Sequence, residues 1–139
     1  MSDTRERRSV ELWGEEFEVI SEYSRAQAIE DGFLVDVTET AKEAGFKIPV
    51  ALTRAVWNKY VEVPEGVTGQ DIKGRLWDIL WMLYWEIKEN PKAQETLLFK
   101  LHVRDDNRER PPPLVTLKAV CGPGDNGDPV ITIMLREED

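Results

Sequence analysis

The sequence predicts an α+β fold in which a C-terminal three-stranded antiparallel meander packs on one long, tryptophan-rich helix. The helix is indicated by apolar residues that recur every three or four positions between residues 70 and 89. The meander is indicated by alternating apolar residues in segments 97–103, 114–121 and 130–135. Because no helix-length segment separates these strands, we expect neighbouring strands to run antiparallel.

The N-terminal half is expected to contain short helices and one or two short strands. Ser24 and Gln27 have the spacing of a capping box, which predicts a helix from Arg25 to about Asp31. Residues 33–37 alternate and predict a strand. Residues 11–22 fit either a helix with a glutamate stripe or an extended segment, and Gly14 favours the extended form.

Three further elements are expected before the long helix. Thr38 is placed to cap a helix over residues 39–44 that ends at Gly45. The segment 46–52 contains Pro49, which fits an edge strand or the start of a helix. Residues 53–60 are predicted to be helical.

The domain organisation follows from length and polarity. A chain of 139 residues with 41% hydrophobic residues is large enough to form one packed domain. Residues 1–10 are polar and are interpreted as a flexible tail. Residues 11–139 are then expected to form a single α+β domain.

Charge and cysteine content restrict the class of protein. The net charge of −9 disfavours direct binding to nucleic acid, because a phosphate backbone repels an acidic surface. Cys121 is the only cysteine, so no intrachain disulfide can form and a reducing compartment is expected. The most apolar run, 76–85, is too short to cross a bilayer and contains Asp78. We therefore expect a soluble, cytoplasmic protein without a membrane partner.

The long helix is apolar over a wider arc than a surface helix needs. The aliphatic side of this helix is expected to pack on the apolar face of the sheet. Aromatic residues extend the apolar surface of the helix around one flank. One interpretation is that the N-terminal helices and Trp57 cover the aromatic arc. The alternative is a surface for a partner protein or for self-association, because tryptophan and tyrosine are favoured at interfaces. This candidate interaction surface consists of Trp77, Trp81, Tyr84 and Trp85.

No catalytic, cofactor-binding or metal-binding residues are predicted. Residues 122–127 match the letters of G-x-G-x-x-G, but a strand follows them where a dinucleotide site requires a helix. His102 is expected on the sheet face opposite Cys121, which excludes a thiol–imidazole pair. The charged loop 104–113 is interpreted as a connector, with recognition as the alternative.

Several segments resemble an uncharacterised bacterial family of unknown function. The similar segments are YSRAQAIEDG at 23–32, LVDVT at 34–38, GRLWD at 74–78, LKAVCGPGD at 117–125 and VITIM at 130–134. The resemblance runs from about residue 20 to the end of the chain. It implies an association with plasmids, integrative elements and phages, and it assigns no catalytic residue.

These observations leave the biological process unknown and three functions open. The first is a non-enzymatic accessory protein, associated with a mobile element, that binds another protein or itself. The second is an acidic mimic of DNA that inhibits a host enzyme. The third is an enzyme with an unrecognised carboxylate site.

Overall fold

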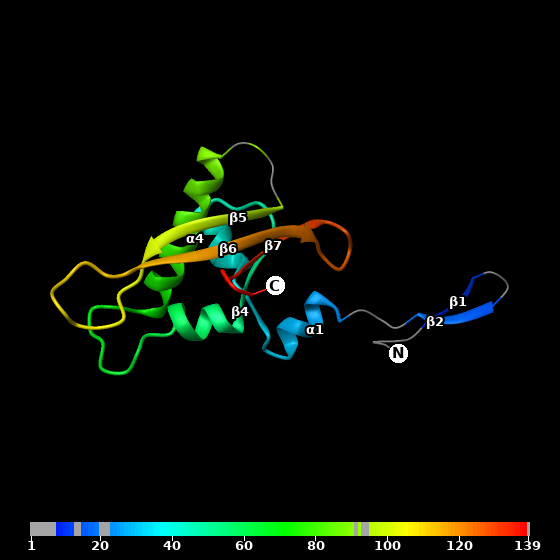
Figure 1. Cartoon of the computed structure of the whole chain (residues 1–139), viewed down its shortest axis with the longest axis horizontal. Helices are drawn as coiled ribbons and strands as arrows, with labels where there is room; N and C mark the ends of the chain where they lie inside the picture. The colour runs from blue at the N-terminus through cyan, green and yellow to red at the C-terminus, as the bar shows by residue number, and fades with distance from the viewer. Residues whose placement is uncertain (1–7, 13–14, 20–22, 91, 93–94, 139) are drawn as a thin grey trace.

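The computed structural model describes residues 8–12, 15–19, 23–90, 92 and 95–138. Figure 1 shows the elements along the chain. In chain order they are β1 (Arg8–Leu12), β2 (Glu15–Val19), α1 (Arg25–Glu30), β3 (Leu34–Asp36), α2 (Thr38–Ala44), β4 (Val50–Thr53), α3 (Arg54–Val56), the π-helical η1 (Trp57–Val61), α4 (Ile72–Glu89), β5 (Thr96–His102), β6 (Leu114–Pro123) and β7 (Pro129–Leu135).

The main sheet has five strands in the order β3-β4-β7-β6-β5. The predicted meander is present as β5, β6 and β7, which pair antiparallel. The prediction of three strands was incomplete, because β4 pairs parallel to β7 and carries β3 antiparallel on its other side. The sheet is therefore mixed (Figure 1).

Segment 46–52 contains a strand, but neither alternative given for Pro49, an edge strand or the start of a helix, was correct. The β4 strand lies between β3 and β7, and its residues Val50, Ala51 and Leu52 are fully buried. Pro49 precedes the strand, so its missing amide removes no hydrogen bond from the ladder. Burial on both faces, rather than alternation, explains the continuous apolar run Val50–Leu52.

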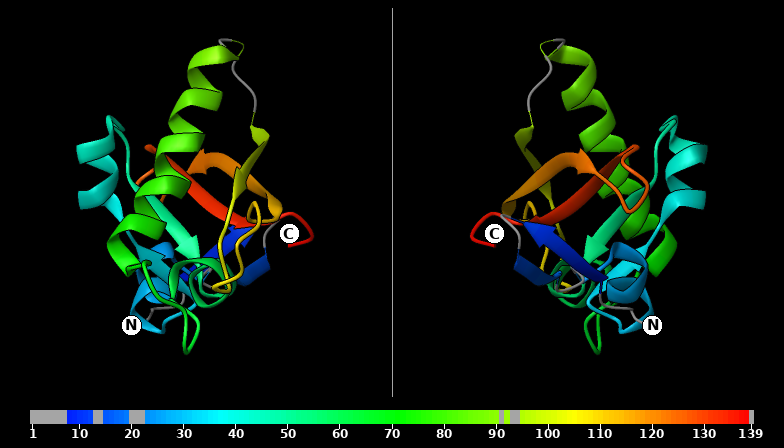
Figure 2. Two further views of the ribbon diagram at one scale, coloured as in Figure 1. Left: turned by 90° about the vertical axis from the view of Figure 1, so that its left-hand side faces the viewer. Right: turned by 90° about the vertical axis from the view of Figure 1, so that its right-hand side faces the viewer.

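Helix α4 covers one face of the sheet and centres the core. Its fully buried residues Leu80 and Leu83 belong to the same cluster as Phe99, Leu117 and Ile133 of the strands. Helix α2 contacts α4 as well. The left view of Figure 2 shows α4 with the sheet on one side and α2 on the other. Among the described residues, no helix is both long and apolar enough to cross a membrane.

Helix α1 lies against the opposite face of the sheet. The Arg25 guanidinium donates to Oγ1 of Thr132 at 2.6 Å and to the carbonyl of Ile131 at 2.7 Å. The predicted capping box is confirmed. Oγ of Ser24 accepts from the amide of Gln27 at 3.0 Å, and Oε1 of Gln27 accepts from the amide of Ser24 at 3.1 Å.

Helix α2 begins differently from its prediction. Its N-cap is Val37, and Thr38 is the first helical residue. The Thr38 hydroxyl instead donates to the Asp36 carboxylate at 2.6 Å and accepts from the amide of Val50 at 3.2 Å. These bonds join the start of α2 to β4. The helix ends as predicted at Gly45, which has a φ of 112°.

The first two strands form a separate antiparallel pair. In β1 and β2, Arg8 pairs with Val19 and Leu12 pairs with Glu15. The preference for extended structure in residues 11–22 is therefore confirmed over the two described strands. The β1 strand starts at Arg8, inside the segment interpreted as a tail, and residues 1–7 lie outside the described residues.

Candidate interaction surface on α4

The side of α4 that faces away from the core carries large apolar side chains. Trp81 is 39% exposed, Met82 40% and Trp85 47%. The core side of the helix is formed by Leu76, Ile79, Leu80 and Leu83, which are at most 6% exposed. At about 100° per residue, the two groups lie on opposite sides of the helix. We call Trp81, Met82 and Trp85 the outer patch.

Four aromatic rings of α4 form a continuous cluster. Trp81 stacks on Trp77 with a centroid distance of 5.9 Å and an interplanar angle of 15°, and on Tyr84 at 6.0 Å and 14°. Trp85 meets Trp81 edge to face at 5.8 Å and 80°. Offset stacked and edge-to-face arrangements are the favourable geometries for aromatic pairs. The rings therefore hold one another in place.

The cluster is anchored to the rest of the molecule through Tyr84. The Phe46 ring meets Tyr84 edge to face at 6.0 Å, and Phe46 is itself 8% exposed. The Lys88 ammonium lies 5.2 Å from the Tyr84 ring centroid, within the range of a cation–π contact. The aromatic cluster thus has a buried side at Phe46 and an open side at the outer patch.

All four residues of the predicted surface come together, with different exposure. Trp77 and Tyr84 are half-buried and pack against the core. Trp81 and Trp85 are exposed. Met82 was missed, because on a helical wheel it falls among charged residues. Met82 lies one residue after Trp81 and three residues before Trp85, and this spacing was the signal that could have placed it on the same face.

The N-terminal end of α4 is polar and contains a buried arginine. Arg75, in the first turn of α4, is only 4% exposed. Its guanidinium donates to the carbonyl of Arg104 at 2.6 Å and pairs with the Asp105 carboxylate at 2.9 Å. Arg75 therefore fixes the start of the 104–113 loop against the helix.

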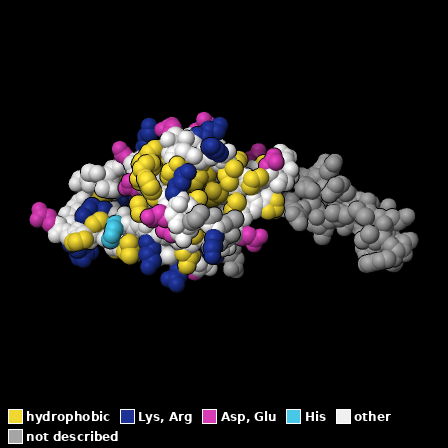
Figure 3. All heavy atoms as spheres, turned by 90° about the horizontal axis from the view of Figure 1, so that it is seen from above, with side chains coloured by type: hydrophobic (Ala, Val, Ile, Leu, Met, Phe, Trp, Pro, Cys, Tyr) yellow, Lys and Arg dark blue, Asp and Glu magenta, His cyan; other side chains and the backbone are white. Residues whose placement is uncertain are grey.

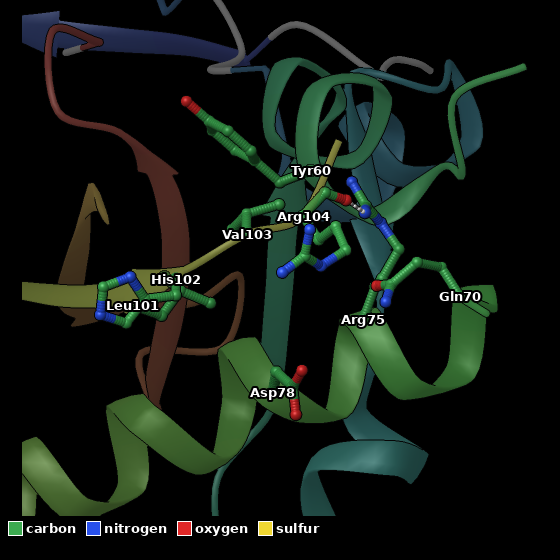
Figure 4. A pocket seen from close by; sticks show the side chains of 8 residues that line it. All are labelled: Tyr60, Gln70, Arg75, Asp78, Leu101, His102, Val103 and Arg104. Carbon is green, nitrogen blue, oxygen red and sulfur yellow. Dashed lines mark hydrogen bonds between the residues drawn. The ribbon is translucent and has the colours of Figure 1, made fainter. Parts of the chain in front are cut away.

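Two hollows adjoin Arg75. The smaller measures about 20 Å³, which is room for about one water molecule, and its lining residues include Tyr60, Arg104 and Asp78 (Figure 4). The larger and more open one measures about 470 Å³ and includes Asp71 and Asp78 in its lining. Asp71 is engaged as the N-cap of α4, accepting from the amide of Gly74 at 2.6 Å. Desolvation raises the pKa of Asp78, and the charge of Arg75 opposes that shift.

The charged loop 104–113 is docked onto the loop before α4. The Asn107 side chain accepts from the amide of Thr68 and donates to the carbonyl of Gly66, both at 2.8 Å. The Arg104 guanidinium donates to the carbonyls of Arg108 and Arg110, both at 2.7 Å. The loop is therefore ordered by its own hydrogen bonds and by its contacts with the loop before α4, and its interpretation as a connector stays a prediction.

The structure keeps Cys121 and His102 apart. Cys121 packs against the core, while His102 is exposed and its Nδ1 lies 2.8 Å from the carbonyl of Pro112. On β6, Cys121 pairs with Ile131 and Leu114 pairs with His102, so the two side chains lie near opposite ends of the strand. In the described ranges, no three or more His, Cys, Asp or Glu side chains are grouped to hold a metal ion.

The comparison with protein families gives one match over most of the chain. Residues 12–139 match the model described as "Family of unknown function (DUF6573)". The chain belongs to DUF6573. No curated protein and no solved structure matches it. The resemblance to a family of unknown function is thereby confirmed.

Two of the segments that resemble the family meet in this DUF6573 chain. The Asp125 carboxylate accepts from the amide of Arg25 at 2.8 Å and from the amide of Ala26 at 3.0 Å. It therefore caps α1 from a loop that is distant in the sequence. The glycine-rich segment 122–127 spans the end of β6 and the turn that presents this cap, and β7 follows it as predicted.

Proposed function

We propose that this protein acts by binding another protein chain through the outer patch of α4. The observation that carries the proposal is the exposure of Trp81, Met82 and Trp85 on the side of α4 opposite the core. Aromatic residues and methionine are enriched at protein interfaces, and tryptophan is a frequent energetic anchor. Isolated exposed apolar residues are common, whereas three on one helix face form a patch.

The rigidity of the patch supports the same function. Trp81 is in contact with Trp77, Tyr84 and Trp85, so its ring is already ordered in the free chain. Ordering a side chain upon binding costs about 0.5–1.5 kcal/mol. A ring that is held in place beforehand avoids much of that cost, as a binding surface requires.

The charge on the face that Figure 3 shows favours a protein partner over the role of a DNA mimic. Figure 3 looks onto the C-terminal end of α4, where hydrophobic side chains gather and charges of both signs are interspersed. Ion pairs among the described residues, such as Lys42–Glu39 and Arg110–Asp106, also place opposite charges next to each other on the surface. A mimic of duplex DNA needs a band of one sign. The association with a mobile element, which the resemblance implies, stays a prediction.

Photo-crosslinking from the patch tests the proposal in cells that naturally carry the chain. A photoreactive phenylalanine analogue replaces Met82 in one variant and Leu98 in a control. Leu98 is 45% exposed, similar to Met82, but it lies on β5. We expect a protein adduct from position 82 that disappears when Trp85→Glu is added, and none from position 98. A folded variant that gives no adduct from position 82 contradicts the proposal.

A further inference from the structure

The turn between β6 and β7 presents an asparagine followed by a glycine at the surface. Residues 125–129 are all exposed. The turn is closed by hydrogen bonds from the amide of Gly124 to the carbonyl of Asp128 at 2.7 Å and from the amide of Gly127 to the carbonyl of Gly124 at 3.0 Å. Among the hydrogen bonds that join described residues, none involves the side chain of Asn126. This side chain can therefore rotate towards the backbone that follows it.

Gly127 leaves the backbone nitrogen after Asn126 open to approach. A Cβ atom built on Gly127 would meet no atom within 4 Å. Glycine adopts the φ of 86° found here without strain, and it can reach many other backbone conformations when the turn opens. The Gly127 amide must first leave the Gly124 carbonyl. Such an opening is easiest in an exposed turn, because few contacts are lost there.

The remaining asparagines lack this combination. Asn90 is followed by Pro91, whose nitrogen carries no hydrogen that it could release. The Asn107 side chain is held by hydrogen bonds to the loop before α4, and Asn58 lies within the η1 helix. Long side chains follow Asn58 and Asn107 in the sequence, whereas glycine follows Asn126. Asn126 is therefore the asparagine whose side chain and following nitrogen are both accessible.

We propose that Asn126 is a site of spontaneous deamidation through a cyclic imide formed with Gly127. The Gly127 nitrogen gives up its proton and bonds to the side-chain carbonyl carbon of Asn126, while the side-chain nitrogen takes up a proton and leaves as ammonia. Water then breaks one of the two C–N bonds of the imide. Breaking the new bond gives aspartate. Breaking the original peptide bond gives isoaspartate, in which the backbone runs through the side chain. No atom is oxidised or reduced in either step.

The reaction is expected to depend on the contact between this turn and α1. Asp125 precedes Asn126, and its carboxylate accepts from the amides of Arg25 at 2.8 Å and Ala26 at 3.0 Å. These bonds tie the turn to α1 and oppose the change of shape that ring closure requires. Loss of the cap should therefore speed deamidation. In the other direction, isoaspartate lengthens the backbone beside Asp125 and should weaken the cap.

Incubation of the intact chain at mildly alkaline pH, followed by peptide mapping with mass spectrometry, tests the site. We expect position 126 to deamidate at least about tenfold faster than Asn58 and Asn107 in the same sample, a barrier difference of about 1.4 kcal/mol or more. Enzymatic methylation of isoaspartate should label the product, because the cyclic imide yields isoaspartate and direct hydrolysis of the amide does not. A rate at position 126 no higher than that at Asn107, or a product without isoaspartate, overturns the proposal.

Variants of the same turn test the dependence on α1. Asp125→Ala removes the cap and should speed deamidation at position 126 by about threefold or more, whereas Asp125→Ser keeps an acceptor oxygen and should change the rate less. Asp128→Ala removes a carboxylate from the same turn without removing a cap, and it is the matched control. Equal rates in Asp125→Ala and Asp128→Ala overturn the dependence on α1.

A second measurement applies if Asp125→Ala fails to fold. Aged wild-type chains that carry isoaspartate at position 126 are separated from unmodified chains, and both are unfolded in urea. The modified chains should unfold at a lower urea concentration, because the cap on α1 is weakened. Equal midpoints overturn the link between the turn and α1.

Discussion

The Tyr84 ring lies directly against the backbone of Gly45 at the end of α2. A Cβ atom built on Gly45 would come within 2.7 Å of Cε1 of Tyr84. Gly45 also has a φ of 112°, a conformation that residues with a side chain rarely adopt. Glycine is therefore required at this position for two reasons. It adopts the positive φ of the turn that ends α2, and it leaves room for the Tyr84 ring.

Substitution Gly45→Ala is expected to lower the free energy of unfolding by about 2–4 kcal/mol, from backbone strain and from displacement of the Tyr84 ring. Urea denaturation measures the loss. Gly66→Ala is the matched control, because Gly66 has a φ of 83° and no atom within 4 Å of its added Cβ. It should lose about 1 kcal/mol from strain alone. Equal losses in both variants would show that the contact with Tyr84 has no steric consequence.

The outer and inner sides of α4 should differ in their contribution to stability. Trp85 is 47% exposed and Leu80 is fully buried. We expect Trp85→Ala to cost about 1 kcal/mol, mainly from lost aromatic contacts, and Leu80→Ala to cost about 2–5 kcal/mol, because it leaves a cavity. Chemical denaturation of both variants provides the comparison. A loss of more than about 3 kcal/mol in Trp85→Ala would assign the ring to the core and contradict the outer patch.

The cap that Asp125 provides to α1 should be measurable in the same way. Substitution Asp125→Ala leaves the amides of Arg25 and Ala26 without this acceptor, and we expect a loss of about 1–2 kcal/mol. Asp128 lies in the same loop and is exposed, and its backbone carbonyl rather than its side chain accepts from Gly124. Asp128→Ala should therefore change stability by no more than about 0.5 kcal/mol. A similar loss in both variants would indicate a general effect of loop charge.

The hydrogen bond from Tyr23 to Asp31 should appear in the titration of the phenol. This bond raises the pKa of Tyr23 from 10.0 to about 12, with smaller contributions from desolvation and the charge of Asp31. Because the folded-state pKa is raised, the associated stability is fully present below pH 10 and is lost as the pH rises through about 12.

Absorbance titration of the phenolate follows this ionisation, and the difference between wild type and Tyr23→Phe assigns the signal to Tyr23. Substitution Asp31→Asn removes the main cause of the shift, so the Tyr23 component should move towards 10.0. A component that stays near 12 in Asp31→Asn would contradict the role of this bond.

Elements with strong local signals were predicted correctly from the sequence. The capping box of Ser24 and Gln27 predicted the bounds of α1 to within one residue, because a cap depends on residues that are close in the chain. The hydrophobic periodicity of α4 predicted that helix, and the alternation in β5, β6 and β7 predicted three strands. The short connections between the strands predicted their antiparallel pairing. Helical spacing also predicted that the four aromatic residues of α4 lie side by side, as they do, while their role as an interaction surface stays a prediction.

Features that depend on distant segments were not predictable. The parallel pairing of β4 with β7 joins segments about 80 residues apart, and no local pattern specifies it. Arg75 is buried because Arg104 and Asp105 lie over it, which a helical wheel cannot show. Asp125 is of a residue type that is common in turns, and only the position of α1 in the folded chain makes it a helix cap.

The sequence by itself determined that a wide apolar helix carries Trp77, Trp81, Tyr84 and Trp85, because hydrophobic periodicity is a local property of the chain. Only the tertiary structure decided which of these rings are covered. Helix α2 and Phe46 reach the Tyr84 flank of α4, while the described part of the chain leaves Trp81 and Trp85 exposed. The reason is that burial depends on which surfaces meet in space, and those contacts are set by the packing of elements that are distant in the sequence.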